Sequence, residues 1–314
     1  MIQLSTQAAS LFVNSPVISE KFETYFRSVY HGRWKALRAA LLEPVRQVAR
    51  VNRFAEAIKI PPDQIVPHLE NTFWRPQDFK ISEDSQGLST TYILDPASVI
   101  VARALEVQRT DVVLDMCAAP GGKSVILAEE MFFSKIQDSN QEPIGQLVSN
   151  EMSESRRARL IKVFQEYIPR EHRDFVHVRG LDGNQYGLRN PGVFDRVLAD
   201  VPCSGERHLF ENPAELAMWT EKRTKNLSIR QYSLLSAAWL ACKVGGRIVY
   251  STCSISPLEN DEVVAKLVKK RGPEVLRPDF LETYDFLEET EFGYRILPDT
   301  CGFGPMYFAV LQKN

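Results

Sequence analysis

From about Thr90 onward, short apolar runs alternate with helical patterns along the sequence, and this order leaves few possible folds. Five runs have the length and composition of strands: Val112–Asp115, Leu147–Asn150, Phe175–Val178, Arg196–Ala199 and Arg247–Tyr250. Helical patterns follow four of them, at Ser124–Phe133, Ser155–Tyr167, Ile229–Ala241 and Leu258–Lys270. Strands that alternate with helices specify a parallel sheet with helices on both faces. We therefore predict a doubly wound, Rossmann-like α/β domain, which binds ligands at the carboxyl ends of its strands.

The two ends of the chain add to this domain. Gly293–Leu297 and Met306–Leu311 are predicted to form a terminal β-hairpin on the sheet. Near the N-terminus, apolar residues recur with helical spacing in three segments, Ser19–Tyr30, Arg33–Leu42 and Pro44–Ile58. The proline-rich and polar stretch at 61–87 indicates an irregular connection. The prediction is a small helical N-terminal domain at residues 1–88, followed by the α/β domain at residues 89–314.

The charge is nearly balanced overall but is basic near the N-terminus. A net charge of −2 argues against a general nucleic-acid coat protein. Six cations nevertheless lie between residues 33 and 53, opposed only by Glu43: Arg33, Lys35, Arg38, Arg46, Arg50 and Arg53. The i, i+4, i+7 spacing of Arg46, Arg50 and Arg53 predicts one side of a helix, which could contact phosphates. Further basic clusters occur at residues 222–230 and 266–271.

The cysteine pattern and the first residues bear on metals and location. None of the five cysteines forms a C-x-x-C pair, so we predict no metal site. Their odd number and scatter favour a reducing compartment. The longest apolar stretch, Leu234–Cys242, is too short to span a bilayer. The first basic residue is Lys21, which does not fit a secretory signal or a mitochondrial presequence. We expect a cytoplasmic protein without a membrane segment, and leave an organellar location open.

Three loops at predicted strand ends favour an adenosine ligand. The first, Asp115–Lys123, places small residues and a glycine pair between a strand and a helix, where backbone can approach a ligand closely. It is not a P-loop, because Cys117 stands where the first glycine would be. Glu151 follows the second strand and could accept hydrogen bonds from ribose hydroxyls. Asp182 follows the third strand, within reach of an adenine edge. Alone, either acid is more often a cap or turn residue.

Two cysteines follow the next two strands. Cys203 ends the segment Asp200–Cys203, and Cys253 lies in Ser251–Ser254. A lone cysteine is usually a small buried hydrophobe, but a strand end beside a helix N-terminus has electropositive surroundings that favour thiolate. Such a thiolate could add to carbon 6 of a cytosine and make carbon 5 reactive toward a methyl donor. A carboxyl group held at N3 would stabilise the adduct. This chemistry leaves open which cysteine attacks.

At these five loops the sequence resembles the Sun family of RNA cytosine-5 methyltransferases. Asp115–Lys123 resembles the family's cofactor loop, Asp200–Cys203 its D-x-P-C motif, and Thr252-Cys253 its T-C motif. The likeness runs from about residue 92 to residue 311. Tyr92–Ser98 and Gly304–Phe308 look most like the compact branch that includes organellar rRNA and tRNA enzymes.

This resemblance implies a role for each residue. Cys253 would be the nucleophile, Cys203 would assist release, and Asp200 would hold the cytosine beside the cofactor. S-adenosylmethionine would be bound by Cys117, Ala118, Ala119, Pro120, Gly121, Gly122, Lys123, Glu151, Asp182 and Asp200. The chain departs from the family at Glu151, where many members have aspartate, and at residues 206–208, where a small, Thr-rich continuation is usual.

The resemblance also implies partners and leaves alternatives. The substrate would be rRNA or tRNA, gripped by the basic N-terminal domain or with the help of a protein partner; otherwise we expect a monomer. A DNA cytosine-5 methyltransferase would attack with the cysteine of its Pro-Cys motif, here Cys203. A protein or small-molecule methyltransferase would not need both cysteines. A non-catalytic RNA-binding ribosome assembly factor is the third alternative, against which the intact Cys203, Cys253, Asp200 and Lys123 argue.

Overall fold

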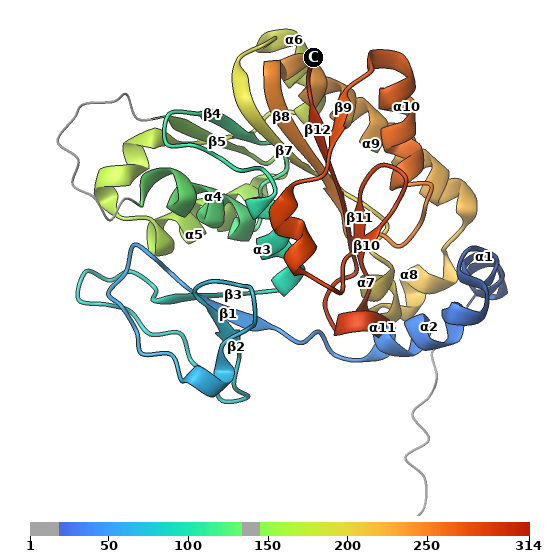
Figure 1. The fold of residues 1–314 in the computed structure, drawn as a ribbon, viewed down its shortest axis with the longest axis horizontal. Coiled ribbons are helices and arrows are strands. Elements are labelled where there is room, and N and C mark those ends of the chain that lie inside the picture. The colour runs from blue at the N-terminus through green and yellow to red at the C-terminus, as the bar shows by residue number, and fades with distance from the viewer. Residues whose placement is uncertain (1–18, 134–144) are drawn as a thin grey trace, which may run out of the picture.

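A nine-stranded mixed sheet forms the centre of the molecule (Figure 1) in the computed structural model, which describes residues 19–133 and 145–314. The strand order is β10-β11-β12-β8-β7-β4-β5-β6, and β9 pairs with β12. The central strands are β4 (Val112–Asp115), β5 (Gln146–Asn150), β6 (Val176–Arg179), β7 (Phe194–Asp200) and β8 (Cys242–Thr252). All five run parallel. The five predicted strands and their parallel arrangement are confirmed.

Helices cover both faces of this sheet because alternate strand residues point to opposite sides. On β4, Val113 enters a core with α3 (Pro96–Arg103), α4 (Gly122–Phe132) and α5 (Glu154–Tyr167). The next residue, Leu114, enters a second core with α6 (Tyr186–Arg189), α9 (Glu221–Ala241) and α10 (Asp261–Arg271). Val249 and Ile248 of β8 divide between the two cores in the same way. The doubly wound prediction is therefore confirmed.

The C-terminal segment forms the predicted hairpin. β11 (Tyr294–Ile296) pairs antiparallel with β12 (Met306–Gln312), and β12 extends the sheet beyond β8. Two short strands, β9 (Glu274–Leu276) and β10 (Glu288–Glu289), were not predicted. Each has only two or three residues, which is too few to show an alternating apolar pattern.

The N-terminal region is only partly helical. Helices α1 (Glu20–Tyr30) and α2 (Trp34–Leu42) match two predicted helices. The third predicted helix, Pro44–Ile58, is wrong, because Val48–Val51 is strand β1 of a three-stranded antiparallel sheet. Its partners are β2 (Thr72–Trp74), within the predicted irregular connection, and β3 (Thr91–Leu94). Pairing with distant segments outweighs local helical spacing here. The small sheet thus includes strands from both sides of the boundary predicted at residue 88.

Helices α1 and α2 pack against the segment that follows Cys203 (Figure 1). This segment consists of α7 (Glu206–Glu211) and α8 (Pro213–Ala217). The Phe22 ring lies 5.5 Å from Phe210 and 5.2 Å from Trp219, both in edge-to-face arrangements. Phe26 stacks on Trp34 at 5.3 Å. An aromatic cluster therefore joins the N-terminal helices to the region around the two predicted catalytic cysteines.

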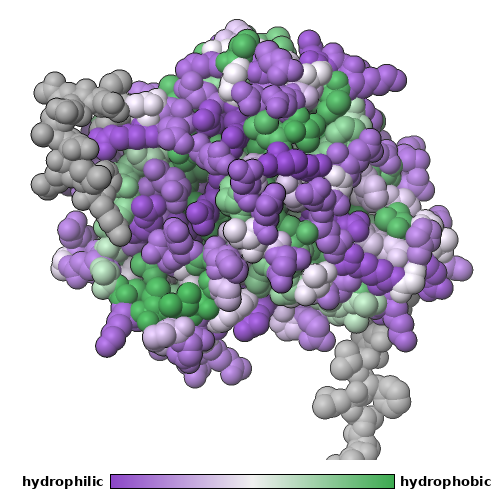
Figure 2. Space-filling view, in the orientation of Figure 1, coloured by the Kyte–Doolittle hydropathy of each residue, from purple (hydrophilic) through white to green (hydrophobic). Residues whose placement is uncertain are grey.

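Hydrophilic side chains cover most of the face seen in Figure 2, and hydrophobic ones gather in separate patches. Within residues 19–133 and 145–314, no helix is long and apolar enough to cross a membrane. In the same ranges, no group of three or more His, Cys, Asp or Glu side chains is arranged to hold a metal ion. The expectation about targeting depends on residues 1–18, which lie outside the described residues.

Candidate active site

The predicted cofactor loop connects β4 to α4 and comes close to neighbouring side chains. Gly121 has φ 121°, a left-handed conformation that favours glycine. A Cβ atom on Gly121 would lie 3.0 Å from Leu160 Cδ1, and one on Gly122 would lie 2.9 Å from Tyr92 Cε1. The glycine pair therefore allows a tight turn into the helix at a place where larger residues would clash.

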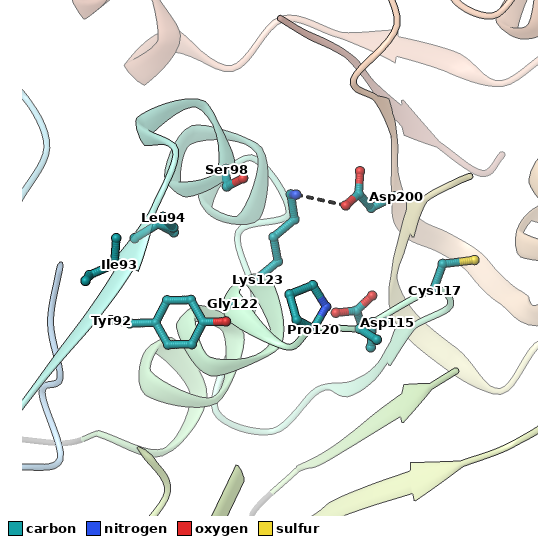
Figure 3. Close-up of a pocket in the computed structure, with 12 residues that line it drawn as sticks. Tyr92, Ile93, Leu94, Ser98, Asp115, Cys117, Pro120, Gly122, Lys123 and Asp200 are labelled. Carbon is teal, nitrogen blue, oxygen red and sulfur yellow. Dashed lines mark hydrogen bonds and ion pairs between the residues drawn. The ribbon is translucent and has the colours of Figure 1, made fainter. Parts of the chain in front are cut away.

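A cavity of about 190 Å³ lies in front of this loop (Figure 3). Seven of the ten predicted cofactor residues line it: Cys117, Ala118, Ala119, Pro120, Gly122, Lys123 and Asp200. The opposite wall comes from β3 and α3, which contribute Tyr92, Leu94 and Ser98. The sequence did not indicate these residues as lining, because they precede the first strand of the predicted sheet, Val112–Asp115, by up to twenty residues. The cavity combines a glycine-containing loop, charged groups and apolar walls, as small-molecule sites usually do.

An ion pair crosses the cavity. Lys123 Nζ lies 2.8 Å from Asp200 Oδ2, and Ser251 Oγ donates a 2.7 Å hydrogen bond to Asp200 Oδ1. Burial alone would lower the pKa of Lys123, but the charge of Asp200 raises it above its ordinary value. The lysine is therefore an ammonium, and both oxygens of Asp200 are held in a defined orientation.

A second carboxyl group of this cavity lacks a full set of partners. Asp115 is 1% exposed, and its Oδ2 accepts a 2.6 Å hydrogen bond from Ser124 Oγ. Its Oδ1 has no hydrogen-bond partner among the described residues. Burial, followed by the charge of Asp200, raises the pKa of Asp115 to about 7. Buried polar atoms usually have partners, so this oxygen suits a ligand that supplies one.

Glu151 and Asp182 lie at the ends of β5 and β6, at the sheet edge where they were predicted. Glu151 is 5% exposed; its Oε1 accepts from the Ser153 backbone N–H at 2.8 Å, and its Oε2 lies 3.2 Å from Arg156 Nη1. Asp182 Oδ1 accepts from the backbone and side-chain N–H groups of Asn184. Both acids have local structural roles, and neither is among the residues lining the cavity. Their contact with a cofactor stays a prediction.

The two predicted catalytic cysteines meet at the ends of adjacent strands β7 and β8. Their Sγ atoms are 2.8 Å apart, both are free thiols, and the Cys253 backbone N–H donates to Cys203 Sγ at 3.2 Å. Cys253 is exposed and Cys203 half-buried. The hydrogen bond with Cys253 and burial raise the pKa of Cys203 well above its ordinary value. This pKa shift is opposite to the one expected from the thiolate-favouring surroundings predicted at a strand end, and its main causes are the hydrogen bond with Cys253 and burial.

A buried carboxyl pair connects the two cysteine loops. Glu206 and Glu259 are both 0% exposed. The hydroxyls of Ser204, beside Cys203, and Ser254, beside Cys253, each contact both carboxyl groups. Burial, followed by the charge of Glu259, raises the pKa of Glu206 to about 7. The sequence missed this pair, although Glu206 is one of the departures from the family pattern.

Helix α1 also touches the Cys253 loop. Tyr30 Oη donates a 2.7 Å hydrogen bond to the Ile255 carbonyl, and the Tyr25 hydroxyl lies 2.9 Å from Ser256 Oγ. Together with the aromatic packing on α7 and α8, these contacts tie α1 to both cysteine loops. The structure thus gives part of the N-terminal region a role in positioning these loops that its charge pattern did not indicate.

The predicted phosphate-binding helix face is wrong. Arg50 lies in strand β1, is 4% exposed and forms an ion pair with the buried Glu129. The Arg46 guanidinium lies 3.5 Å from the centre of the Trp74 ring, and Arg53 pairs with a glutamate of α4 at 3.1 Å. Because residues 48–51 form strand β1, the i, i+4, i+7 spacing does not place these arginines on one helix face. Their contacts stabilise the small sheet and its packing on α4.

Comparisons with known proteins agree with this geometry. The family model described as 16S rRNA methyltransferase RsmB/F matches residues 102–312. The chain is 35% identical over 245 residues to the 5-cytosine rRNA methyltransferase NSUN4 of Mus musculus, covering 73% of this chain and 61% of that protein. It is 28% identical over 326 residues to a mitochondrial tRNA (cytosine(34)-C(5))-methyltransferase of Mus musculus, covering 95% of this chain and 90% of that one.

Solved structures share the fold. A methyltransferase homologue from Pyrococcus horikoshii superimposes with a TM-score of 0.73 at 22% identity, covering 94% of this chain and 95% of that one. The chain spans about three fifths of the length of the NSUN4 relatives. The matched family and relatives confirm the resemblance drawn from the five loops. The chain belongs to the RsmB/F family of 16S rRNA methyltransferases.

Proposed function

We propose that the chain is an S-adenosylmethionine-dependent RNA (cytosine-5)-methyltransferase acting on rRNA or tRNA. The observation that carries the proposal is the pair of thiols 2.8 Å apart at the ends of β7 and β8, beside the oriented Asp200 carboxylate. Methyl transfer to other acceptors does not require a thiol pair. Cytosine carbon 5, in contrast, becomes reactive only when a nucleophile such as a thiolate has added to carbon 6. Relatives named as rRNA and tRNA cytosine methyltransferases support the RNA class.

Part of the cofactor would occupy the cavity of about 190 Å³ at the Asp115–Lys123 loop, and the rest would lie along the same sheet edge toward Glu151 and Asp182. The backbone of the loop would approach the cofactor at the glycine pair. Asp115 Oδ1, which has no partner among the described residues, would accept a hydrogen bond from the cofactor. S-adenosylmethionine supplies the methyl group when it is bound. Asp200 lines this cavity and lies three residues before Cys203. Its carboxylate, kept in place by Lys123, would accept a hydrogen bond from N3 of the cytosine in the adduct, in which N3 carries a proton.

The raised pKa of Cys203 supports different roles for the two thiols. Cys253 Sγ bonds to carbon 6, and the electron pair moves to carbon 5, which then takes the methyl group. A base removes the proton from carbon 5, the double bond forms again and the carbon–sulfur bond breaks. Cys203 stays protonated and lies close enough to donate its proton to the departing Cys253 sulfur.

A tritium-release assay tests the proposal. RNA and DNA labelled with tritium at cytosine carbon 5 are incubated with the protein and S-adenosylmethionine. Release from rRNA or tRNA, absent from DNA and absent in a Cys253→Ala variant, is the expected result. Release from DNA alone would support the DNA enzyme, and RNA binding without release would support the assembly factor.

The proposal also covers RNA affinity, the oligomeric state and the cellular location. With Arg50 buried, we propose that other exposed basic residues or a protein partner supply RNA affinity, and that the chain is otherwise a monomer. We propose a cytoplasmic or organellar location; one relative is named as mitochondrial.

A further inference from the structure

A second cavity, of about 180 Å³, lies at Cys203 and Ser204 and shares no lining residue with the cavity described above. Its remaining walls come from α7, α8 and the first turns of α9, the segment packed against α1. The cavity is well below the roughly 300–1,000 Å³ of sites for drug-sized ligands. It has room for one small fragment directly beside the cysteine pair.

Two buried polar groups in its wall have no partner. Trp219 is 3% exposed and Thr224 is 1% exposed. Neither the indole N–H of Trp219 nor the hydroxyl of Thr224 forms a hydrogen bond with any described residue. Native proteins nearly always pair such groups, so two of them in one small cavity wall point to a ligand that completes the hydrogen bonding.

The charged groups of the wall indicate the chemistry of this ligand. Arg223 is exposed and Glu215 half-buried, and neither side chain has a hydrogen bond or ion pair with the residues the structure describes. Arginine and the indole donate hydrogen bonds, glutamate accepts them, and threonine does both. A phosphate offers only acceptors and would meet the charge of Glu215. A nucleobase edge carries donors and acceptors together and matches the set.

We propose that this cavity binds the nucleobase next to the target cytosine in the RNA, and so selects the sequence around the target. This rests on the proposed function, because Cys253, which would hold the target base, lies 2.8 Å from the Cys203 sulfur at the cavity. RNA sequence is commonly read from unstacked single-stranded bases through their edges. Two basic residues in the first turn of α9 then differ in role. Arg223 binds a base in the cavity, whereas Lys222 contributes only positive charge.

The first test observes the cavity directly and does not require activity. Nucleoside 5′-monophosphates of the four RNA bases are titrated onto the ¹⁵N-labelled protein, and the indole N–H signals are followed. A Trp219→Phe variant identifies the Trp219 signal. We expect that signal to shift most with one of the four bases, with at least tenfold weaker binding in Arg223→Met and unchanged binding in Lys222→Met. No shift with any base, or equal loss in both variants, overturns the proposal.

The second test measures selection during methylation. RNA stem-loops with randomised bases around one cytosine are treated with the protein and S-adenosylmethionine and read by bisulfite sequencing. The wild type and Lys222→Met should prefer one base at one flanking position, and Arg223→Met and Glu215→Gln should lose this preference. A uniform fall in methylation for all flanking bases contradicts the subsite. Absence of any methylation by the wild type counts against the proposed function, and the titration then decides on the cavity separately.

Discussion

Replacing Glu206 by glutamine tests whether the buried carboxyl pair controls the stability of the cysteine loops. Burial raises the pKa of Glu206 from 4.5 to about 7. A raised folded pKa means that the protonated form stabilises the fold, so its contribution is complete below about pH 4.5 and is lost as the pH rises to about 7. At about 1.4 kcal/mol per pKa unit, this interval is worth roughly 3 kcal/mol of unfolding free energy. Glutamine keeps the shape and cannot ionise.

Urea unfolding at pH 5 and pH 8 measures the effect. We subtract the free energy of unfolding of the wild type from that of Glu206→Gln. This difference should increase by up to about 3 kcal/mol from pH 5 to pH 8, because the wild type loses stability over this range. The subtraction removes the contribution of Asp115, whose pKa is also raised to about 7. Glu211→Gln, on the same helix at a 68% exposed side chain, is the matched control. A difference that does not change with pH would show that the pKa of Glu206 is not raised in the folded protein.

Three further predictions address the cofactor, the N-terminal helices and the small sheet. Glu151→Ala and Asp182→Ala should each weaken S-adenosylmethionine binding about ten- to a hundredfold by calorimetry, since a hydrogen bond to a charged group is worth about 1.5–3 kcal/mol; unchanged affinity in both would remove these residues from the site. Tyr30→Phe should cost about 1 kcal/mol of stability and slow methyl transfer without changing cofactor affinity. Arg50→Ala should cost about 3–5 kcal/mol in urea unfolding, because it leaves Glu129 buried without its partner; a loss of RNA affinity at unchanged stability would contradict this.

Local patterns predicted the central sheet because its strands are buried and apolar. Val112–Asp115 has the predicted bounds, and the other central strands differ from prediction mainly in length. The carboxyl ends of parallel strands meet at one edge, so strand order alone was enough to bring Asp200, Cys203 and Cys253 together. Position along the strands thus carried most of the information about the site.

Features that depend on distant partners could not be predicted in this way. Arg46, Arg50 and Arg53 do have helical spacing, but residues 48–51 pair with strand residues 22 to 46 positions away, and this pairing decides the local conformation. The burial of Glu206 beside Glu259 likewise arises from packing between segments about 50 residues apart. No pattern in the sequence around Glu206 or Glu259 indicates that either side chain is buried.

Covalent trapping separates the roles proposed for the two cysteines, attack by Cys253 and release by Cys203. Each cysteine is replaced by alanine, the variant is incubated with RNA substrate and S-adenosylmethionine, and protein–RNA adducts that survive denaturant are counted on a gel. Cys253→Ala should form no adduct and no 5-methylcytosine. Cys203→Ala should accumulate methylated RNA bonded to the protein, because the first bond forms and the last does not break. Adducts in Cys253→Ala and none in Cys203→Ala would assign the attack to Cys203 and the release to Cys253.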